Sequence, residues 1–462
     1  MKERVLILLI TVVWTFSVMA DNLNKKDSLD NINSGKPLYS AVTEILNLSV
    51  SSNPYILGDE GHACYRIPSL AISQSETILA FAEGRTNDCA DDGDIDLVLK
   101  RSIDRGQTWG NLITILNPGT NRAVNPCPVV LPSGRILLLY CANPTGANNL
   151  SVYVTYSDND GLTWSTGRSL DVYLNPPGFT WFRTGPCHGI IKKFAPNIGR
   201  IIIPANHREN SGANQYSHVI YSDDGGTTWS RGGNVPYTNG NESTVVELST
   251  GEIMLNMRNS DATNDYRVVS VSSDGGKTFP SYNLDYFLVE PTCQGSIIYH
   301  SLNTVTGKGN ILFSNPNNAS SRRNGTIKIS TDNAKTWAVG YVYSTVDNIY
   351  TSYSDLAIFS NGDVALLHEK GFDNIDGLWF KTLTFKEVGG TTSKVDIVEQ
   401  NSNIEIHDNM IYVDASSNEG IRIFNTIGTM ISSTIKNQLN IEKLKSGIYL
   451  VKSGSSTRKF IK

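Results

Sequence analysis

Short stretches of alternating apolar and polar residues recur through the middle of the chain. The alternation is clearest at 95–101, 150–156, 216–221, 266–272 and 325–329. Side chains of a strand point alternately to its two faces, so this period of two predicts half-buried β-strands joined in hairpins. No segment between these stretches has the pattern of a long amphipathic helix. The chain is therefore predicted to be all-β.

An eight-residue sequence follows each of these strands. It reads SIDRGQTW at 102–109, SDNDGLTW at 157–164, SDDGGTTW at 222–229, SSDGGKTF at 272–279 and STDNAKTW at 330–337. The fifth position, usually Gly, can take a positive φ, and the Asp or Asn at the third can hydrogen-bond the backbone of the turn. The terminal aromatic residue can pack beneath that turn. We interpret the repeat as a structural turn and not as a catalytic motif.

The spacing of the repeats predicts the architecture. Successive copies begin 55, 65, 50 and 58 residues apart. Units of this size suit four-stranded sheets, and such sheets arranged in a ring form a β-propeller. Five copies predict a six-bladed propeller over residues 45–388, in which one blade lacks the repeat.

The two ends of the chain have a different texture. Residues 1–20 combine two basic residues, the apolar run 5–18 and small residues before position 21, which predicts a secretory signal peptide. The run is shorter than the ~20 apolar residues of a membrane span, so we expect export and no membrane span. Residues 21–44 are predicted to be a polar lead-in. A linker at 389–402 is predicted to precede a small β-sandwich-like domain at 403–462.

Composition excludes some classes of function. The net charge is −5, with 39 Lys and Arg against 44 Asp and Glu, so nothing favours a nucleic-acid partner. No two cysteines have the C-x-x-C spacing of zinc and thiol-redox sites. Six cysteines allow 15 complete pairings, and the sequence leaves both disulfides and buried thiols open. They are Cys64, Cys89, Cys127, Cys141, Cys187 and Cys293.

The sequence Tyr-Arg-Ile-Pro at 65–68 precedes the first repeat. This motif, followed by five Asp boxes of the kind described above, resembles the sialidases (neuraminidases). The resemblance covers roughly residues 45–388. It implies a six-bladed propeller glycosidase that removes terminal sialic acid and needs no metal or organic cofactor.

Sialic acid carries a carboxylate on its anomeric carbon, and Arg suits such a group because its planar fork pairs bidentately with carboxylate. The resemblance implies a cluster of three arginines, matched here by Arg66, Arg258 and Arg322. Arg323 is the alternative for the third position. Two further matches are Arg85, which the resemblance places in the substrate pocket, and Glu369, which it places against the first arginine. Glu369 could instead be an exposed residue at the end of a strand.

A carboxylate nucleophile would be repelled by the carboxylate of the substrate, and sialidases use Tyr instead. Tyr353 matches the nucleophile of the family, with Tyr350 as the alternative, and Glu242 matches the partner base. Glu247 lies at an odd spacing from Glu242 on the same predicted strand, so it should point to the opposite face.

The acid/base residue is expected on the acidic loop that follows the first strands. Asp91 is the best match by its spacing from Arg85, and Asp92 is second. The loop also imitates the start of a calcium-binding EF-hand, but Leu97 stands where Gly is required and Ile103 where Glu is required. No metal site is therefore predicted.

Residues 403–462 resemble the sorting domains of the type IX secretion system. The similarity lies in the segments IRIFNTIG and LKSGIYLV and in the basic and apolar end of the chain. It implies a contact with secretion machinery and a secreted or cell-surface location. The alternative, a carbohydrate-binding module, is disfavoured because this region has few aromatic residues for sugar stacking.

The predicted function is that of an exo-α-sialidase acting with retention on sialylated glycans, glycoproteins or gangliosides. A trans-sialidase and an intramolecular trans-sialidase would use the same residues. A non-catalytic propeller that binds sialic acid is the alternative outside enzymes. Such a protein would not need Tyr353, Glu242 and Asp91 together.

Overall fold

The computed structural model describes residues 50–462 with several gaps. Outside the described residues lie 1–49, 144–149, 175–178, 210–213, 304–305, 345–348, 373, 392–403, 408, 414–419, 426–429, 435, 445–447, 454–455 and 462. The predicted signal peptide, the lead-in and most of the predicted linker fall outside the described part.

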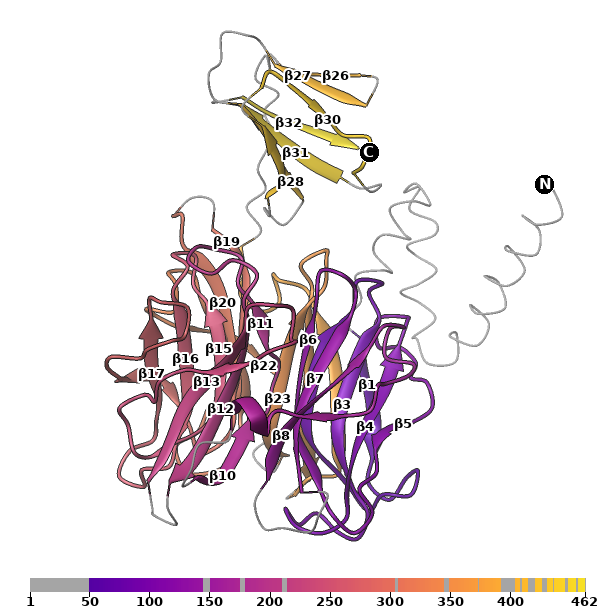
Figure 1. Ribbon diagram of the computed structural model, residues 1–462, viewed down its shortest axis with the longest axis vertical. Coiled ribbons are helices and arrows are strands. Elements are labelled where there is room, and N and C mark those ends of the chain that lie inside the picture. Colours follow the sequence, from indigo (N-terminus) through magenta and orange to yellow (C-terminus); the bar gives the residue numbers. More distant parts are fainter. Residues whose placement is uncertain are drawn as a thin grey trace, which may run out of the picture. The chain divides into compact units, whose positions relative to one another are not determined.

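Six antiparallel sheets are found in the described residues from Ser51 to Leu383 (Figure 1). The first sheet contains β2 (Cys64–Ile72), β3 (Ile78–Arg85), β4 (Ile95–Ser102) and β5 (Ile113–Leu116). The second contains β6 (Ala123–Val130), β7 (Ile136–Ala142), β8 (Ser151–Ser157) and β9 (Arg168–Ser169). The third contains β10 (Phe179–Thr184), β11 (Ile190–Ile191), β12 (Ile201–Glu209), β13 (Gln215–Ser222) and β14 (Ser230–Arg231). The fourth contains β15 (Gly240–Glu247), β16 (Ile253–Asn259), β17 (Tyr266–Ser272) and β18 (Asn283–Val289). The fifth contains β19 (Ser296–Leu302), β20 (Gly309–Pro316), β21 (Gly325–Ser330) and β22 (Ala338–Val342). The sixth contains β23 (Ile349–Ile358), β24 (Val364–Phe372), β25 (Gly377–Leu383) and β1 (Ser51–Ile56). A single turn of helix, α4 (Asp171–Leu174), follows β9.

Contacts between neighbouring sheets close a ring, and most of them involve the first strand of a sheet. Strand β2 contacts both β6 and β23, and β19 contacts both β15 and β23. Strand β1 pairs with β25, so the beginning of the described chain completes the last sheet. This pairing leaves β25 with a neighbour on each side and joins the two ends of the ring. The predicted all-β propeller fold is confirmed, and the predicted number of blades stays a prediction.

The five Asp boxes follow β4, β8, β13, β17 and β21, and no copy follows β25, the corresponding strand of the sixth sheet. In the first copy, the hydroxyl of Ser102 accepts from the Gly106 amide at 2.8 Å and the carboxylate of Asp104 accepts from the Thr108 amide at 2.9 Å. The fifth residue has positive φ in every copy, including Ala334 at 59°. The repeat is a hydrogen-bonded turn, as its composition predicts.

Two small sheets make up the described residues from Ile404 to Ile461. One contains β26 (Ile404–His407), β27 (Met410–Val413) and β30 (Gln438–Asn440), and the other contains β28 (Ile421–Asn425), β29 (Met430–Thr434), β31 (Ile448–Ser453) and β32 (Ser456–Ile461). Buried Ile411, Ile423 and Val451, drawn from both sheets, belong to one apolar cluster. The region is therefore β-sandwich-like, as predicted, while the exact domain boundaries stay predictions.

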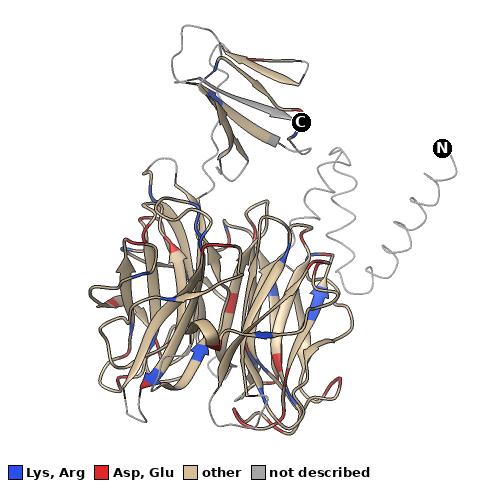
Figure 2. Cartoon of the chain, viewed as in Figure 1, with Lys and Arg blue, Asp and Glu red and all other residues tan. Residues whose placement is uncertain are grey.

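Acidic and basic residues are interspersed over the strands and loops of the part of the chain that the structure describes (Figure 2). Within that part, no helix is both long enough and apolar enough to cross a membrane.

Replacing Gly226 with Ala should destabilise the propeller more than replacing its neighbour Gly225. Both glycines have positive φ, of 93° and 72°, but a Cβ on Gly226 would lie 2.6 Å from Leu137 while one on Gly225 would meet nothing. Gly225→Ala should lower the free energy of unfolding by about 1–2 kcal/mol for its backbone conformation alone. Gly226→Ala should lower it by about 1–3 kcal/mol more because of the overpacking. Urea denaturation measures both, and equal losses would contradict the proposed contact.

Candidate active site

Several predicted site residues lie where a strand that begins a sheet pairs irregularly with its neighbour. The register of β2 shifts between Arg66 and Ser69, that of β15 between Gly240 and Ser243, and that of β23 within residues 351–354. Bulges of this kind bend a strand and turn its side chains to a new direction, and they are common beside active sites. Arg66, Glu242 and Tyr353 all lie at these irregularities.

The hydroxyl of Tyr353 is hydrogen-bonded to a carboxylate. It donates to Oε1 of Glu242 at 2.5 Å, and the other oxygen of Glu242 accepts from Arg258 at 2.7 Å. Arg258 also donates to the hydroxyl oxygen of Tyr353 at 3.0 Å. The ring of Tyr353 packs with Ile67 and Cys293, and only 6% of the residue is exposed. A phenol, a base and a guanidinium thus form one connected group.

Two further arginines lie against the ring of Tyr353. The guanidinium carbon of Arg66 is 5.5 Å from the ring centroid, and that of Arg322 is 5.6 Å from it. Arg322 also donates to the hydroxyl of Ser352 at 3.1 Å. With Arg258, the three arginines come from three different sheets or their loops and surround one phenol. Such a cluster can hold a carboxylate against Tyr353.

Glu369 fixes the position of Arg66. Its oxygens accept from Nε and Nη2 of Arg66 at 3.1 and 3.3 Å, and its side chain is fully buried. It also accepts from the backbone amides of Ile67 at 3.0 Å and Tyr353 at 3.2 Å. Burial alone would raise the pKa of Glu369, but Arg66 and these hydrogen bonds hold it below its usual value. The alternative of an exposed strand-end residue is wrong.

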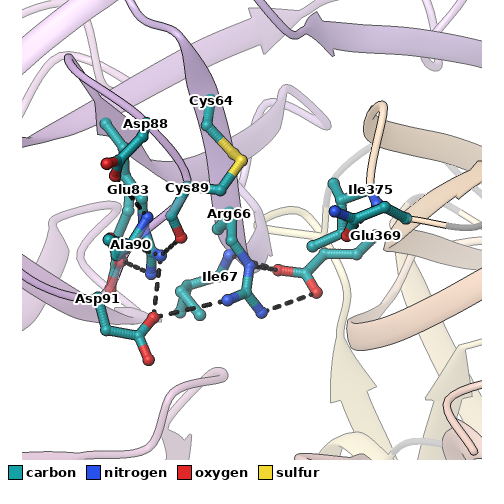
Figure 3. The surroundings of a disulfide bond; sticks show 12 residues. Cys64, Arg66, Ile67, Glu83, Asp88, Cys89, Ala90, Asp91, Glu369 and Ile375 are labelled. Atoms are coloured by element: carbon teal, nitrogen blue, oxygen red, sulfur yellow. Dashed lines mark hydrogen bonds and ion pairs between the residues drawn. A yellow bond between two sulfur atoms is a disulfide. The ribbon is translucent and has the colours of Figure 1, made fainter.

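Arg85 connects the first sheet to the acidic loop. Its Nη2 donates to buried Glu83 at 2.7 Å, and its Nη1 donates to the carbonyl of Ala90 at 2.9 Å and to the carboxylate of Asp91 at 2.9 Å. A disulfide between Cys64 and Cys89 fastens the same loop to β2, next to Arg66 (Figure 3). The remaining four cysteines are buried and free.

Asp91 is the exposed member of the site. Its side chain is 74% exposed, and its Oδ1 lies 3.5 Å from Nη1 of Arg66. Partial burial would raise the pKa of Asp91, but the charges of Arg85 and Arg66 outweigh it and lower the pKa below the ordinary Asp value. In the free protein this carboxylate is therefore ionised at neutral pH.

The proton of Tyr353 is held more tightly than that of a free phenol. Burial raises the pKa of Tyr353 well above 10 and Glu242 raises it further, while Arg258 and Arg322 act in the opposite direction. The phenol of Tyr353 consequently keeps its proton at neutral pH in the free protein. Such a group does not repel an approaching anionic ligand.

A cavity of about 260 Å³ opens beside Tyr353. It is lined by Asp91, Trp181, Arg183, Arg208, Asn241, Glu242, Arg258 and Tyr353. A second cavity, of about 320 Å³, is lined mainly by apolar residues such as Leu70, Val129 and Leu356 and contains none of the predicted site residues. We place the candidate site at the first cavity because titratable and charged groups converge there.

The structure gives the contacts of several residues that the sequence left as alternatives. Arg322 contacts Tyr353, whereas Asp92 pairs with Arg122 and, among the described residues, forms no ion pair with Arg85 or Arg66. The hydroxyl of Tyr350 lies 3.5 Å from Arg322. The roles of these residues stay predictions.

Glu247 points away from the site, as its odd spacing from Glu242 predicts. It accepts from the ammonium group of buried Lys192 at 2.6 Å. Among the described residues, no group of three or more His, Cys, Asp or Glu is placed to hold a metal ion.

Sequence reasoning missed several residues of this site. Glu83 precedes Arg85 by two residues on β3, so the period of two could have placed both on one face. Trp181, Arg183 and Arg208 carry no comparable local signal, because the pairing of β10 with β12 brings them together.

Comparison with known proteins identifies the family. Residues 76–366 match the BNR repeat-like domain, and residues 400–462 match the secretion system C-terminal sorting domain. The first match spans more than half of the chain, which therefore belongs to the BNR repeat-like family.

The chain is also similar to proteins named as sialidases. It is 32% identical to the sialidase of Micromonospora viridifaciens over 73% of this chain and 53% of that protein, and 27% identical to the sialidase of Bacteroides fragilis over 72% and 64%. The chain thus spans less than two thirds of either relative. The Hadza microbial sialidase Hz136 shares the fold, with a TM-score of 0.64 and 24% identity over 73% of this chain and 69% of that one.

Replacing both Cys64 and Cys89 with Ser should loosen the loop that carries Asp91. The bond links residues 25 apart, and its loss should lower the free energy of unfolding by about 3 kcal/mol through the entropy of the unfolded chain. Hydrogen exchange should also become faster at residues 86–94 in the folded variant. The same substitution of two free cysteines, Cys127 and Cys187, is the control for changes in packing. Unchanged exchange in the loop would contradict its restraint by the disulfide.

Proposed function

We propose that this protein is an exo-α-sialidase that cleaves terminal α-linked sialic acid with retention of configuration. The observation that carries the proposal is the hydrogen bond from Tyr353 to Glu242 inside a cluster of three arginines. Binding of a carboxylate would require the arginines alone. A buried phenol joined to a base favours catalysis over a non-catalytic sialic-acid-binding propeller.

In the proposed first step, Arg66, Arg258 and Arg322 bind the carboxylate of the sialic acid. Glu242 takes the proton of Tyr353, whose oxygen forms a bond to the anomeric carbon while the bond to the leaving oxygen breaks. Asp91 gives its proton to that leaving oxygen. The result is a covalent glycosyl–tyrosine intermediate and a free aglycone.

In the second step, Asp91 takes a proton from water, and the water oxygen attacks the anomeric carbon. The bond to the oxygen of Tyr353 breaks, and Glu242 returns the proton to it. Two displacements at one carbon give retention.

In the proposed mechanism, binding of the substrate also changes the pKa of Asp91. Asp91 shares Arg66 with the incoming carboxylate, since its oxygen lies 3.5 Å from that guanidinium. A bound substrate would weaken this contact and raise the pKa of Asp91 toward a value suited to proton donation. Ligand binding would thus prepare the acid.

We also propose that the protein is exported and acts on glycans outside the cell. The match of residues 400–462 to the sorting-domain family supports this location. The C-terminal region would then address the protein to the secretion machinery and be removed or used for attachment to the surface.

Tyr353→Phe should lower kcat/KM for an aryl α-sialoside by at least about a thousandfold, because the variant lacks the nucleophilic oxygen. Tyr350→Phe, which removes the neighbouring phenol, should cost less than about tenfold. Release of the aryl group measures both, and proton NMR of the first released sugar should show the α-anomer. Full activity of Tyr353→Phe would refute the proposed nucleophile, and binding of sialoside without turnover by the wild type would favour the lectin alternative.

Asp91→Ala should affect substrates according to their leaving groups. The loss of kcat/KM should be about 10²- to 10⁴-fold for sialyllactose and much smaller for a nitrophenyl sialoside, whose leaving group needs little protonation. Asp92→Ala is the control and should not distinguish the two substrates.

The pH profile tests the same assignment. The first step needs protonated Asp91, and Arg85 and Arg66 keep its pKa low against the raising effect of burial. The kcat/KM of the wild type for sialyllactose should therefore fall as the pH rises above the acidic range. A profile that rises from pH 4 to neutrality, or an equal loss on both substrates, would refute Asp91 as the acid.

A further inference from the structure

A second cluster of basic residues lines the active-site cavity and has no part in the proposed mechanism. The guanidinium carbons of Arg183 and Arg208 lie 4.6 and 4.9 Å from the ring of Trp181. All three residues line the cavity of about 260 Å³ together with Asp91 and Tyr353. Trp181 and Arg183 are partly buried, and Arg208 is exposed.

The strand pairing of the third sheet builds this group. In the register of β10 and β12, Trp181 faces Arg208 and Arg183 faces Asn206. Residues opposite each other in an antiparallel pair share a face, as do residues two apart along a strand. The tryptophan and both arginines therefore project from one face of the sheet at the strand ends.

The two arginines lack carboxylate partners of the kind that neutralise Arg66 and Arg258. Within the described residues, Arg183 and Arg208 form no ion pair with a carboxylate, whereas Arg258 pairs with Glu242 at 2.7 Å. A neutral group, the side-chain amide of Gln215, is placed to accept from Arg208 at 2.9 Å when its oxygen faces the guanidinium.

Buried polar atoms without a hydrogen-bond partner lie in Arg183 and in Asn206, which faces it. The Nε of Arg183 is buried without a partner among the described residues. Neither polar atom of the Asn206 side chain, which is fully buried, has a partner there. Buried polar atoms are normally paired, and two cations held against one ring repel each other, so an anion that accepts from their guanidinium groups would be favourable.

We propose that Trp181, Arg183 and Arg208 form a subsite for a second anionic group of the substrate. The proposal rests on the sialidase function and deepens it, because the first carboxylate is assigned to Arg66, Arg258 and Arg322. The second anion would be the carboxylate of an adjacent sialic acid or a sulfate ester on the glycan. The guanidinium forks would bind its oxygens, and the indole of Trp181, which both guanidiniums contact, would hold them at the cavity.

The subsite predicts a preference for doubly charged glycans. At low ionic strength, kcat/KM should be at least about tenfold higher for α2,8-disialyllactose, or for sulfated α2,3-sialyllactose, than for α2,3-sialyllactose. A preference for the disialyl glycan alone would assign the subsite to carboxylate, and a preference for the sulfated glycan alone would assign it to sulfate. The preference should decline as salt screens the exposed Arg208.

Arg208→Gln should lower the ratio of kcat/KM between the doubly and singly charged substrates by about tenfold. Arg208 is the better position to test, because Arg183 also lines a third, smaller cavity with Asp91 and its loss would alter the acid as well. Arg168→Gln is the matched control. Arg168 is also exposed and lies 5.9 Å from an aromatic ring, that of Tyr173, but it does not line the cavity.

Failure of the subsite and failure of the sialidase function give different results. If no sialoside is turned over by the wild type, the proposed function is wrong. The subsite is overturned if the wild type cleaves all substrates with equal kcat/KM, or if Arg208→Gln keeps the same preference as Arg168→Gln. Calorimetric binding of α2,8-disialyllactose to Tyr353→Phe, with and without Arg208→Gln, tests the subsite without turnover, and equal affinities would overturn it.

Discussion

The buried carboxylate of Glu369 holds the centre of this molecule together. It binds the guanidinium of Arg66 and the backbone amides of Ile67 and Tyr353, and so joins the first sheet of the ring to the last. A buried charge is tolerated only when it is paired and hydrogen-bonded, and here four donors meet that requirement. The same contacts hold Ile67 at a positive φ of 58° and fix the place of Tyr353. The same contacts therefore join the first and last sheets of the propeller and fix the geometry at its centre.

The site combines rigid and exposed parts. Tyr353 lies on β23 and is 6% exposed, whereas Asp91 lies on a loop and its side chain is 74% exposed. The disulfide from Cys64 to Cys89 and the contacts of Arg85 limit how far that loop can depart from the strand. In the proposed mechanism, the nucleophile must be aligned with one atom and benefits from a strand, and the acid must meet the leaving group and then water and benefits from a restrained loop.

Charge organises the rest of the cavity. The arginines around Tyr353 are balanced in part by Glu242 and Glu369, which form ion pairs with Arg258 and Arg66. Arg183 and Arg208 are not balanced in this way among the described residues. A cavity with more fixed positive than negative groups selects anionic ligands.

The sequence by itself determined the strands and the Asp-box turns and supplied the candidate site residues, because these depend on local patterns. Period-two alternation placed the strands, and Tyr353 and Arg66 stand in short recognisable motifs. The sequence could not choose the Cys64–Cys89 bond from 15 pairings, pair β1 with β25, or bring Trp181 next to Arg208. Each of these depends on which strands become neighbours and in what register when the ring closes. Tertiary structure alone decided them, since the energies that select one register come from contacts between residues far apart in the chain.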